Sequence, residues 1–241
     1  MQIRICVEEL ISKDKIIELD SKTTHYLKNV MRKSIGDKIN IFNSISGEFV
    51  AEISQLTKKS CSLLPVKKVK DLSEELQTNL HIAFSLIKPH RLSILIEKLT
   101  ELGASKLTPI ITEHTYSKHI RKDKMQAISK EACEQCERIS VPEISDVIKL
   151  EEFLRGQSKK DNVEIYALDE RAGKGSNLLN TEINFKSENI FIVGPEGGFS
   201  KQEFELFEKY NVKSIDLGSL ILRAETACIS IASIYNQILF K

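Results

Sequence analysis

The sequence contains no uninterrupted apolar stretch of the roughly 18 residues that a membrane-spanning helix requires. The N-terminal segment MQIRICVEEL places Arg4, Glu8 and Glu9 where a secretory signal needs an apolar core. Both absences predict a cytoplasmic protein that has no membrane partner.

An excess of charge of one sign is also missing. The 35 Lys and Arg residues nearly cancel the 34 Asp and Glu residues, which leaves a formal net charge of +1. Any surface for nucleic acid therefore has to be a local basic patch. With 241 residues and 41% hydrophobic content, the chain can bury the core of one large or two small domains.

The cysteines lack the even number and regular spacing of a secreted disulfide framework. The five are scattered, and only Cys133 and Cys136 stand at the spacing of half a zinc site. Both fall within a helical pattern, and no second Cys or His pair lies at ligand spacing. We therefore expect reduced thiols that pack a helix, and no bound metal.

The pattern of apolar residues changes near residue 72. Residues 1–72 resemble short strands around turns at Gly36-Asp37 and Ser46-Gly47, with one helix over about residues 25–33. This pattern predicts a small β-barrel domain. The polar stretch at residues 70–79 is the expected linker.

In residues 73–241, apolar strands alternate with amphipathic helices, which is typical of an α/β domain with a largely parallel sheet. The first of these helices has clear ends, because Pro89 suits a first helical turn and Gly103 a helix end. An apolar stripe between them indicates the buried face, formed by Leu92, Leu95, Ile96, Leu99 and Leu102.

Residues 190–207, IFIVGPEGGFSKQEFELF, contain the first of two glycine-bearing loops that follow a strand. Gly194, Gly197 and Gly198 allow a ligand to approach the backbone closely, and Pro195 stiffens the turn. An ordinary tight turn would also explain the glycines. Three of them around Glu196, directly after a buried strand, favour a small-molecule site.

The start of the helix after this loop is also marked. Ser200 and Glu203 have the spacing of a capping box, and Phe199 and Phe204 have that of a hydrophobic staple. No Lys-Ser or Lys-Thr follows the glycines, and no G-x-G-x-x-G pattern is present, so the loop lacks the signatures of phosphoryl and hydride transfer.

The second glycine-bearing loop lies in residues 214–234, SIDLGSLILRAETACISIASI, where Gly218 closes a strand. Arg223 and Glu225 stand at the entry to the last helix. For Glu225 alone, a helix cap or salt bridge is the more common role. Arg223 differs, because a guanidinium between apolar residues needs an anionic partner, either Glu196 or a ligand group.

The two loops together resemble those of a known family. FIVGPEGGFSKQE with LILRAETA, preceded by IEKLTELGASKLTPIIT and EQCERISVPEI, is similar to the RsmE family, bacterial enzymes of the SPOUT superfamily that methylate a uridine at N3 in 16S ribosomal RNA. The resemblance covers essentially the whole chain, since HYLKNVMRKSIGDKINIFNSISGEF is similar to the family's PUA-like RNA-binding barrel. The chain departs from the family pattern at Leu220, often an arginine, and at Glu137, commonly a glycine.

The resemblance implies a C-terminal domain whose chain end is threaded into a trefoil knot, an exception to the general rule against knots. It also implies that S-adenosylmethionine (SAM) binds in a crevice at this knot. The residues that it implicates in SAM binding are Leu168, Gly194, Pro195, Glu196, Gly197, Gly198, Leu217, Gly218 and Leu222.

The implied chemistry assigns catalytic roles to residues beside these loops. Uracil N3 carries a proton that must leave before its lone pair can attack a methyl group. Arg223 is expected to stabilise negative charge on the neighbouring carbonyl oxygens. Glu225 or Glu196 is expected to accept the proton.

The target base must be unpaired or extruded, because N3 lies on the Watson–Crick edge. Basic side chains then have to hold the flanking RNA, and the candidates are Arg32, Lys33, Lys88, Arg91, Lys118, Arg121, Lys122 and Arg138. Each lysine taken singly is more often a solvated helix residue. His114 and Tyr116 offer a stacking surface, although packing explains them equally well.

The final helix, TACISIASIYNQILF, is apolar on more than one side, so we expect a homodimer in which a second copy covers it. Arg138 would then point toward the cofactor pocket of the other chain. Two other functions stay open: a methyltransferase that acts on transfer RNA, and a non-catalytic RNA-binding factor for ribosome assembly.

Overall fold

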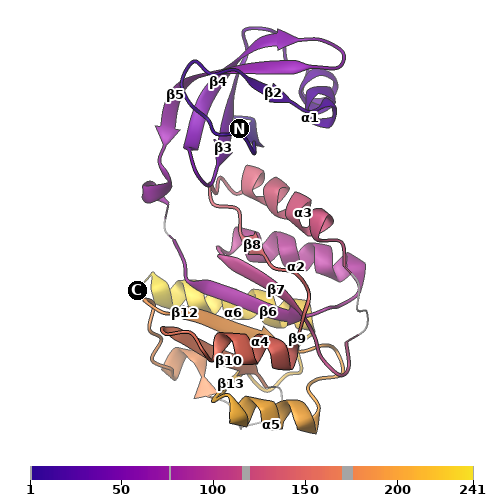
Figure 1. The fold of residues 1–241 in the computed structure, drawn as a ribbon, viewed down its shortest axis with the longest axis vertical. Coiled ribbons are helices and arrows are strands. Elements are labelled where there is room, and N and C mark those ends of the chain that lie inside the picture. Colours follow the sequence, from indigo (N-terminus) through magenta and orange to yellow (C-terminus); the bar gives the residue numbers. More distant parts are fainter. Residues whose placement is uncertain (1, 76, 116–119, 170–175, 241) are drawn as a thin grey trace. The chain divides into compact units, whose positions relative to one another are not determined.

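The computed structural model describes residues 2–75, 77–115, 120–169 and 176–240 (Figure 1). The chain forms two compact units, one of residues 1–76 and 133–141 and the other of residues 77–132 and 142–241. The segment 133–141 thus belongs with the N-terminal unit, whereas the sequence pattern predicts a single crossing between domains. No described helix is both long and apolar enough to cross a membrane.

The N-terminal unit is built on a five-stranded sheet with the order β1-β3-β4-β5-β2. All neighbouring strands are antiparallel except β1 and β3. Three register shifts between β4 and β5 bend the sheet around its core. The strands are β1 (Arg4–Cys6), β2 (Ile17–Leu19), β3 (Lys38–Asn43), β4 (Gly47–Leu56) and β5 (Cys61–Lys70).

The two edge strands of this sheet, β1 and β2, share no hydrogen-bonded ladder within the described residues. Both strands nevertheless contribute to one buried cluster, which contains Ile5 of β1, Ile17 of β2 and Leu27. The structure thus shows a bent five-stranded sheet around one apolar core, and no ladder among the described residues closes it into a barrel.

The helical segment between β2 and β3 begins earlier than predicted. Helix α1 (Ser21–His25) starts after Asp20, whose side chain accepts a hydrogen bond from the backbone N–H of Thr23. A π-helix, η1 (Tyr26–Val30), continues it, and Arg32 follows with a φ of 51°. The apolar pattern missed the first turn because residues 21–25 carry no apolar side chain.

A buried ion pair holds the end of helix α3 (Lys122–Gln135), whose last residues belong to the N-terminal unit. Arg4 donates from Nε and Nη2 to the two carboxylate oxygens of Glu48, each at 2.9 Å, and from Nη1 to the carbonyl oxygen of Cys133 at 2.6 Å. Burial raises the pKa of Glu48, but hydrogen bonds from Arg4 and Asn40 outweigh it and hold that pKa below its usual value.

The predicted linker, residues 70–79, is structured in its first half. Strand β5 ends at Lys70, and a short 3₁₀ helix, η2 (Leu72–Glu74), follows with a capping box at Asp71. Glu75 then accepts hydrogen bonds from the backbone N–H groups of Ile139 and Ser140. These contacts attach the segment 133–141 to the N-terminal unit.

The second unit contains an eight-stranded sheet with the order β11-β13-β10-β12-β6-β7-β8, and β9 pairs with β7. The described strands pair only in parallel, so the predicted α/β domain is confirmed. The strands are β6 (Leu80–Ser85), β7 (Lys106–Ile111), β8 (Glu143–Ile144), β9 (Ile148–Lys149), β10 (Val163–Leu168), β11 (Ser176–Asn177), β12 (Glu188–Val193) and β13 (Lys213–Asp216).

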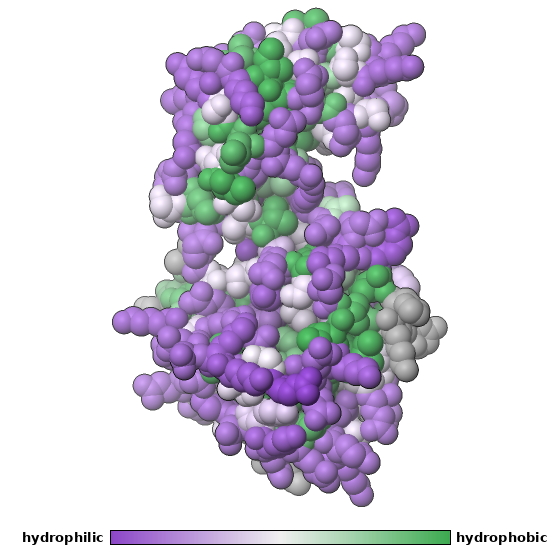
Figure 2. All heavy atoms as spheres, viewed as in Figure 1, coloured by the Kyte–Doolittle hydropathy of each residue, from purple (hydrophilic) through white to green (hydrophobic). Residues whose placement is uncertain are grey.

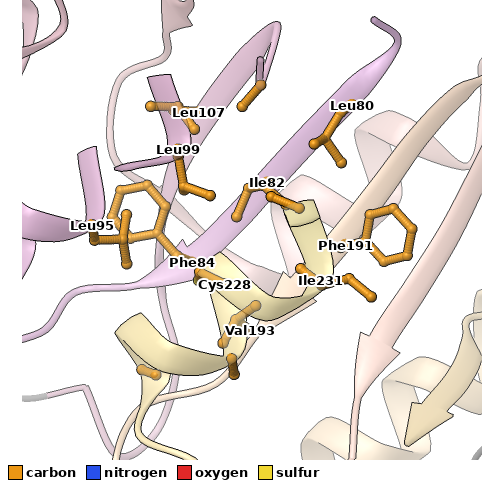
Figure 3. Close-up of a cluster of buried hydrophobic side chains, with 14 of the residues drawn as sticks. Leu80, Ile82, Phe84, Leu95, Leu99, Leu107, Phe191, Val193, Cys228 and Ile231 are labelled. Carbon is orange, nitrogen blue, oxygen red and sulfur yellow. The ribbon is translucent and has the colours of Figure 1, made fainter. Parts of the chain in front are cut away.

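Helices cover both faces of this sheet (Figure 1). They are α2 (Pro89–Glu101), α4 (Leu150–Gln157), α5 (Lys201–Lys209) and α6 (Ala224–Leu239), with a 3₁₀ turn, η3 (Leu178–Asn180), before β12. Figure 3 shows Leu95 of α2 beside Phe84 of β6 and Ile231 of α6 near Phe191 of β12, all in one core. On the other face, Phe207 of α5 packs in a core with Ile190. The sheet is thus buried on both sides, as a parallel sheet requires.

The face of the molecule drawn in Figure 2 is mostly hydrophilic, and hydrophobic side chains gather there in small patches. Several large apolar side chains of the second unit are nevertheless exposed, among them Leu220 at 78% and Ile221 at 81%. Both belong to the loop between β13 and α6.

Candidate active site

A pocket lies where the strands β10, β12 and β13 end at the same edge of the parallel sheet. Ligands of open parallel sheets bind at this edge. Of the nine residues implicated in SAM binding, all but Glu196 line the pocket: Leu168, Gly194, Pro195, Gly197, Gly198, Leu217, Gly218 and Leu222. The structure therefore brings the two glycine-bearing loops together around one cavity.

The loop after β12 has neighbours that leave little room for side chains at Gly194 and Gly197. A Cβ on Gly194 would come within 3.1 Å of the Phe199 ring, and one on Gly197 within 3.0 Å of the Cβ of His114. Gly198 has a φ of +69°, a conformation that L residues rarely adopt. A side chain would therefore be unfavourable at each of these three positions.

Helix α5 begins as the sequence predicts. Ser200 and Glu203 form the capping box, with the Ser200 N–H donating to Glu203 Oε2 at 2.9 Å. The staple residues Phe199 and Phe204 have ring centroids 6.0 Å apart. Glu203 Oε1 also accepts from the N–H of Glu113 at 2.9 Å, which ties the loop after β7 to the pocket loop.

The loop after β13 forms the second wall of the pocket. Asp216 Oδ1 accepts a hydrogen bond from the N–H of Gly218 at 2.7 Å, and Gly218 has a φ of +118°. Leu220 lines the pocket although 78% of its surface is exposed. The loop is thus fixed by a hydrogen bond close to β13 and exposed to solvent at Leu220.

Two carboxylates of the pocket, Asp169 and Asp216, were missed by the sequence analysis. Asp169 directly follows β10 and is only 4% exposed, and Asp216 ends β13. The signal was available, because an acidic residue at the carboxyl end of a buried parallel strand lies at the ligand-binding edge. Acidic side chains there suit a ligand that carries positive charge.

Arg91 of α2 joins the two candidate proton acceptors beside the pocket. Its Nη1 lies 3.2 Å from Glu196 Oε1, and its Nε lies 3.6 Å from Glu225 Oε1. Glu225 Oε2 is buried and has no hydrogen-bond partner within the described residues. Arg91 was predicted to contact RNA, and the structure instead gives it two carboxylate partners.

Arg223 is the N-cap residue of α6 and is exposed to solvent. Its side chain makes no ion pair or hydrogen bond with the part of the chain that the structure describes, and it does not line the pocket. Of the two partners expected for it, Glu196 pairs with Arg91. Water can hydrate an exposed guanidinium, so the fold needs no carboxylate beside it.

The predicted RNA contacts of the second unit differ in their surroundings. Lys88 is exposed at the N-cap of α2. Arg121 and Lys122 are paired with carboxylates, Arg121 Nη2 with Asp123 at 2.5 Å and Lys122 Nζ with Asp146 at 2.9 Å. Lys118 and Tyr116 lie outside the described residues.

The predicted RNA contacts of the N-terminal unit are Arg32, Lys33 and Arg138. Arg32 is exposed and Lys33 is half-buried, both directly after the π-helix. The Arg138 side chain is only 11% exposed and donates from Nε to Ser140 Oγ at 2.9 Å. The structure therefore shows Arg138 engaged within its own chain.

The cysteine pair at the end of α3 has two different environments. Cys133 is buried, and burial raises the pKa of its thiol to about 12. Cys136 lies beyond the helix end and is exposed, so only one of the two packs the helix as expected. The described residues bring together no group of three His, Cys, Asp or Glu side chains that could hold a metal.

Comparisons with known proteins agree with this architecture. A family model for an RNA methyltransferase domain matches residues 74–236, and one for an RNA methyltransferase PUA domain matches residues 19–66. The ribosomal RNA small subunit methyltransferase E of Rickettsia conorii is 34% identical over 229 residues, which cover 94% of this chain and 92% of the relative. The protein of the same name from Bacillus subtilis is 27% identical over 91% of this chain and 89% of its own.

Solved structures share the fold over nearly the whole chain. A putative methyltransferase from Legionella pneumophila, in complex with SAM, has a TM-score of 0.87 at 26% identity and covers 99% of this chain and 98% of its own. A ribosomal RNA small subunit methyltransferase E from Neisseria gonorrhoeae has the same TM-score of 0.87 at 23% identity, with the same coverage of 99% and 98%. The chain therefore belongs to the ribosomal RNA small subunit methyltransferase E family, the RsmE family.

Proposed function

We propose that this protein transfers a methyl group from SAM to N3 of a specific uridine in the 16S RNA of the small ribosomal subunit, in the cytoplasm. The observation that carries the proposal is the pocket at the carboxyl edge of β10, β12 and β13, with its glycine-bearing walls. The names of the relatives support the RNA substrate, and the SAM complex of the Legionella protein supports the methyl donor.

The residues of the pocket fit SAM chemically. Its sulfonium and ammonium groups are cationic, and Asp169 and Asp216 contribute carboxylates to the pocket. Its adenine is flat with two faces that can pack on apolar side chains, and Leu168, Leu217 and Leu222 supply apolar surface. Charged and apolar groups of the ligand therefore both find partners.

Bound SAM would supply an electrophilic methyl group, so the protein has to position the uridine and remove its N3 proton. Glu225 lies in the first turn of α6, next to the pocket-lining Ala224, and is the proposed proton acceptor. Arg223, its exposed neighbour, is proposed to stabilise the negative charge that develops on the uracil carbonyl oxygens.

The N-terminal unit is proposed to hold RNA beside its π-helix. Arg32 is exposed there, Lys33 is half-buried, and the Tyr26 side chain is 37% exposed. Arg and Lys attract phosphates, and unpaired bases stack on aromatic rings. Irregular π-helical turns are frequent at functional sites. Lys88 is the proposed contact in the second unit.

A homodimer remains part of the proposal. Leu220 and Ile221, in the loop before α6, are 78% and 81% exposed, and Phe240, at the other end of α6, is 67% exposed. A second copy would remove apolar side chains such as these from water. Arg138 would have to leave Ser140 to reach the pocket of another chain. Sedimentation equilibrium of the purified protein distinguishes a dimer from a monomer.

The activity test combines the purified protein, methyl-labelled SAM and small ribosomal subunits, followed by mass spectrometry of the RNA nucleosides. Labelled 3-methyluridine in 16S RNA is the expected product. Label in transfer RNA alone would identify a transfer RNA methyltransferase. A protein that binds RNA but shows no heat of binding with SAM would be a non-catalytic factor.

A further inference from the structure

We infer that Arg91 is a positioning residue that aligns the Glu225 carboxylate for proton transfer, and that it is not a contact for RNA phosphate. The inference rests on the proposed function. The observation behind it is a three-residue cluster in which Arg91 pairs with both Glu196 and Glu225.

Arg91 does not line the pocket, but it contacts residues from two segments that do. Glu196 lies between Pro195 and Gly197, which both line the pocket, and Glu225 belongs to the first turn of α6. Arg91 stands 105 residues before Glu196 in the chain and reaches both carboxylates from the first turn of α2. Its guanidinium therefore links the loop after β12 to the start of α6.

Burial makes this link stronger than an ordinary surface ion pair. The side chains of Arg91 and Glu225 are 20% and 13% exposed, and that of Glu196 is 35% exposed. Partly buried charges are screened less by water and salt than exposed ones. The planar fork of a guanidinium can also hold two carboxylates in fixed directions.

The charge of the cluster argues against a phosphate contact. One guanidinium faces two carboxylates, so a phosphate that approached Arg91 would meet an excess of negative charge from Glu196 and Glu225. Lys88, at the N-cap of the same helix, is exposed and stays the proposed phosphate contact of this unit.

Arg91 lies near Oε1 of Glu225 and leaves Oε2 without a partner among the described residues. Glu225 Oε2 is buried and has no hydrogen-bond partner among the described residues, and a buried acceptor without a donor is costly. A uracil N3–H would supply the donor once the entering base displaces the atoms that now cover Oε2. In the step that follows, the N3–H bond breaks and its proton goes to Oε2. The N3 electron pair would bond to the methyl carbon that bound SAM supplies, and the electrons of the broken carbon–sulfur bond would stay on sulfur, which gives S-adenosylhomocysteine.

The test compares Arg91→Ala with Lys88→Ala on small ribosomal subunits, with turnover, KM for the subunits and SAM affinity measured separately. Arg91→Ala should lower kcat by about 10²-fold, because a small displacement of a catalytic group has an effect of that size. Its KM and SAM Kd should stay within about threefold of the wild-type values. Lys88→Ala should raise KM and weaken the dependence of KM on salt.

A double-mutant cycle shows whether Arg91 acts through Glu225. In a Glu225→Gln background, the further change Arg91→Ala should reduce kcat by less than about threefold, since the group that Arg91 positions is already lost. The reduction in kcat caused by Arg91→Ala should also become smaller as pH rises, because a uracil that has already lost its N3 proton needs no proton acceptor. Arg91→Lys keeps the charge without the fork and should lie between Arg91→Ala and the wild type.

One readout does not depend on the RNA substrate. Backbone amides of residues 196–198 and 224–227 should exchange hydrogen faster in Arg91→Ala than in Lys88→Ala, because the link between the loop after β12 and the start of α6 is gone. Wild-type protein that methylates another base would overturn the proposed function and leave this comparison intact. The inference is overturned if Arg91→Ala raises KM at unchanged kcat, or if exchange in both segments equals that of the control.

Discussion

At the scale of the residue, the glycines of the pocket loop are determined by their neighbours. A Cβ added to Gly197 would lie 3.0 Å from the Cβ of His114, and Gly198 has a φ of +69°. Gly156, in α4, has neither constraint, because a Cβ added there would meet nothing within 4 Å and its φ is ordinary. A change to valine should therefore weaken SAM binding at Gly198 and leave it unchanged at Gly156.

Gly198→Val is expected to weaken SAM binding by at least about tenfold, because a side chain in the left-handed conformation costs roughly 1–2 kcal/mol and would crowd the ligand. Circular dichroism should still show a folded protein. Gly156→Val is the matched control, and calorimetry with SAM should give it the wild-type affinity. Wild-type affinity in Gly198→Val would place the SAM site elsewhere.

Arg223→Ala is expected to lower kcat by about 10²- to 10³-fold at unchanged SAM affinity, if Arg223 stabilises charge that appears only in the transition state. Because ionised uracil needs less help, the kcat of the variant should recover in part as pH rises. Methylation rates across a pH series, with SAM affinity at each pH, check both points. An equal loss of SAM binding and turnover would show that Arg223 supports the pocket itself.

At the scale of the element, the buried Arg4 side chain joins strands β1 and β4 to the end of helix α3. Arg4 and Glu48 have side chains that are 4% and 6% exposed. Arg4 also lies over the Phe42 ring, with its Cζ 4.3 Å from the centroid. Removing one partner of such a pair leaves an uncompensated buried charge.

Glu48→Gln is therefore expected to reduce the free energy of unfolding by about 3–5 kcal/mol at pH 7. The pKa of Glu48 in the folded protein lies below its ordinary value of 4.5, so its contribution is present above that pH and is lost as pH falls through the lower, folded-state pKa. Urea unfolding of both proteins at several pH values measures the difference. A difference in unfolding free energy that stayed constant into strong acid would contradict this assignment. Protonation of Glu75 does not affect the comparison, because both proteins contain that carboxyl group.

At the scale of the whole molecule, the chain leaves the N-terminal unit near residue 76 and returns to it at residues 133–141. Within that segment Ile139 and Cys133 are fully buried. A fragment that lacks the N-terminal unit would expose this apolar surface. The trefoil knot implied by the family stays a prediction.

A fragment of residues 77–241 should bind SAM with nearly the affinity of the full chain and methylate RNA poorly, because the proposed RNA contacts at Arg32 and Lys33 are gone. Ile139→Ser in the fragment should improve its solubility by removing an exposed apolar side chain. Calorimetry and the methylation assay together check the division of labour. Full methylation by the fragment would show that the N-terminal unit is dispensable.

Local patterns in the sequence determined much of this protein. Helical spacing located α2, Ser200 and Glu203 marked the start of α5, and the two glycine-bearing loops identified both walls of the pocket. These features depend on residues close together in the chain, where backbone geometry and capping act.

Only the tertiary structure decided which distant side chains meet. Arg91, Glu196 and Glu225 come from three separate segments, and nothing in their local sequence pairs them. The order of the strands placed Asp169 in the pocket. Hydrogen bonds of Arg4 and Glu75 attached the segment 133–141 to the N-terminal unit. Such contacts follow from how the elements pack, which no short window of sequence contains.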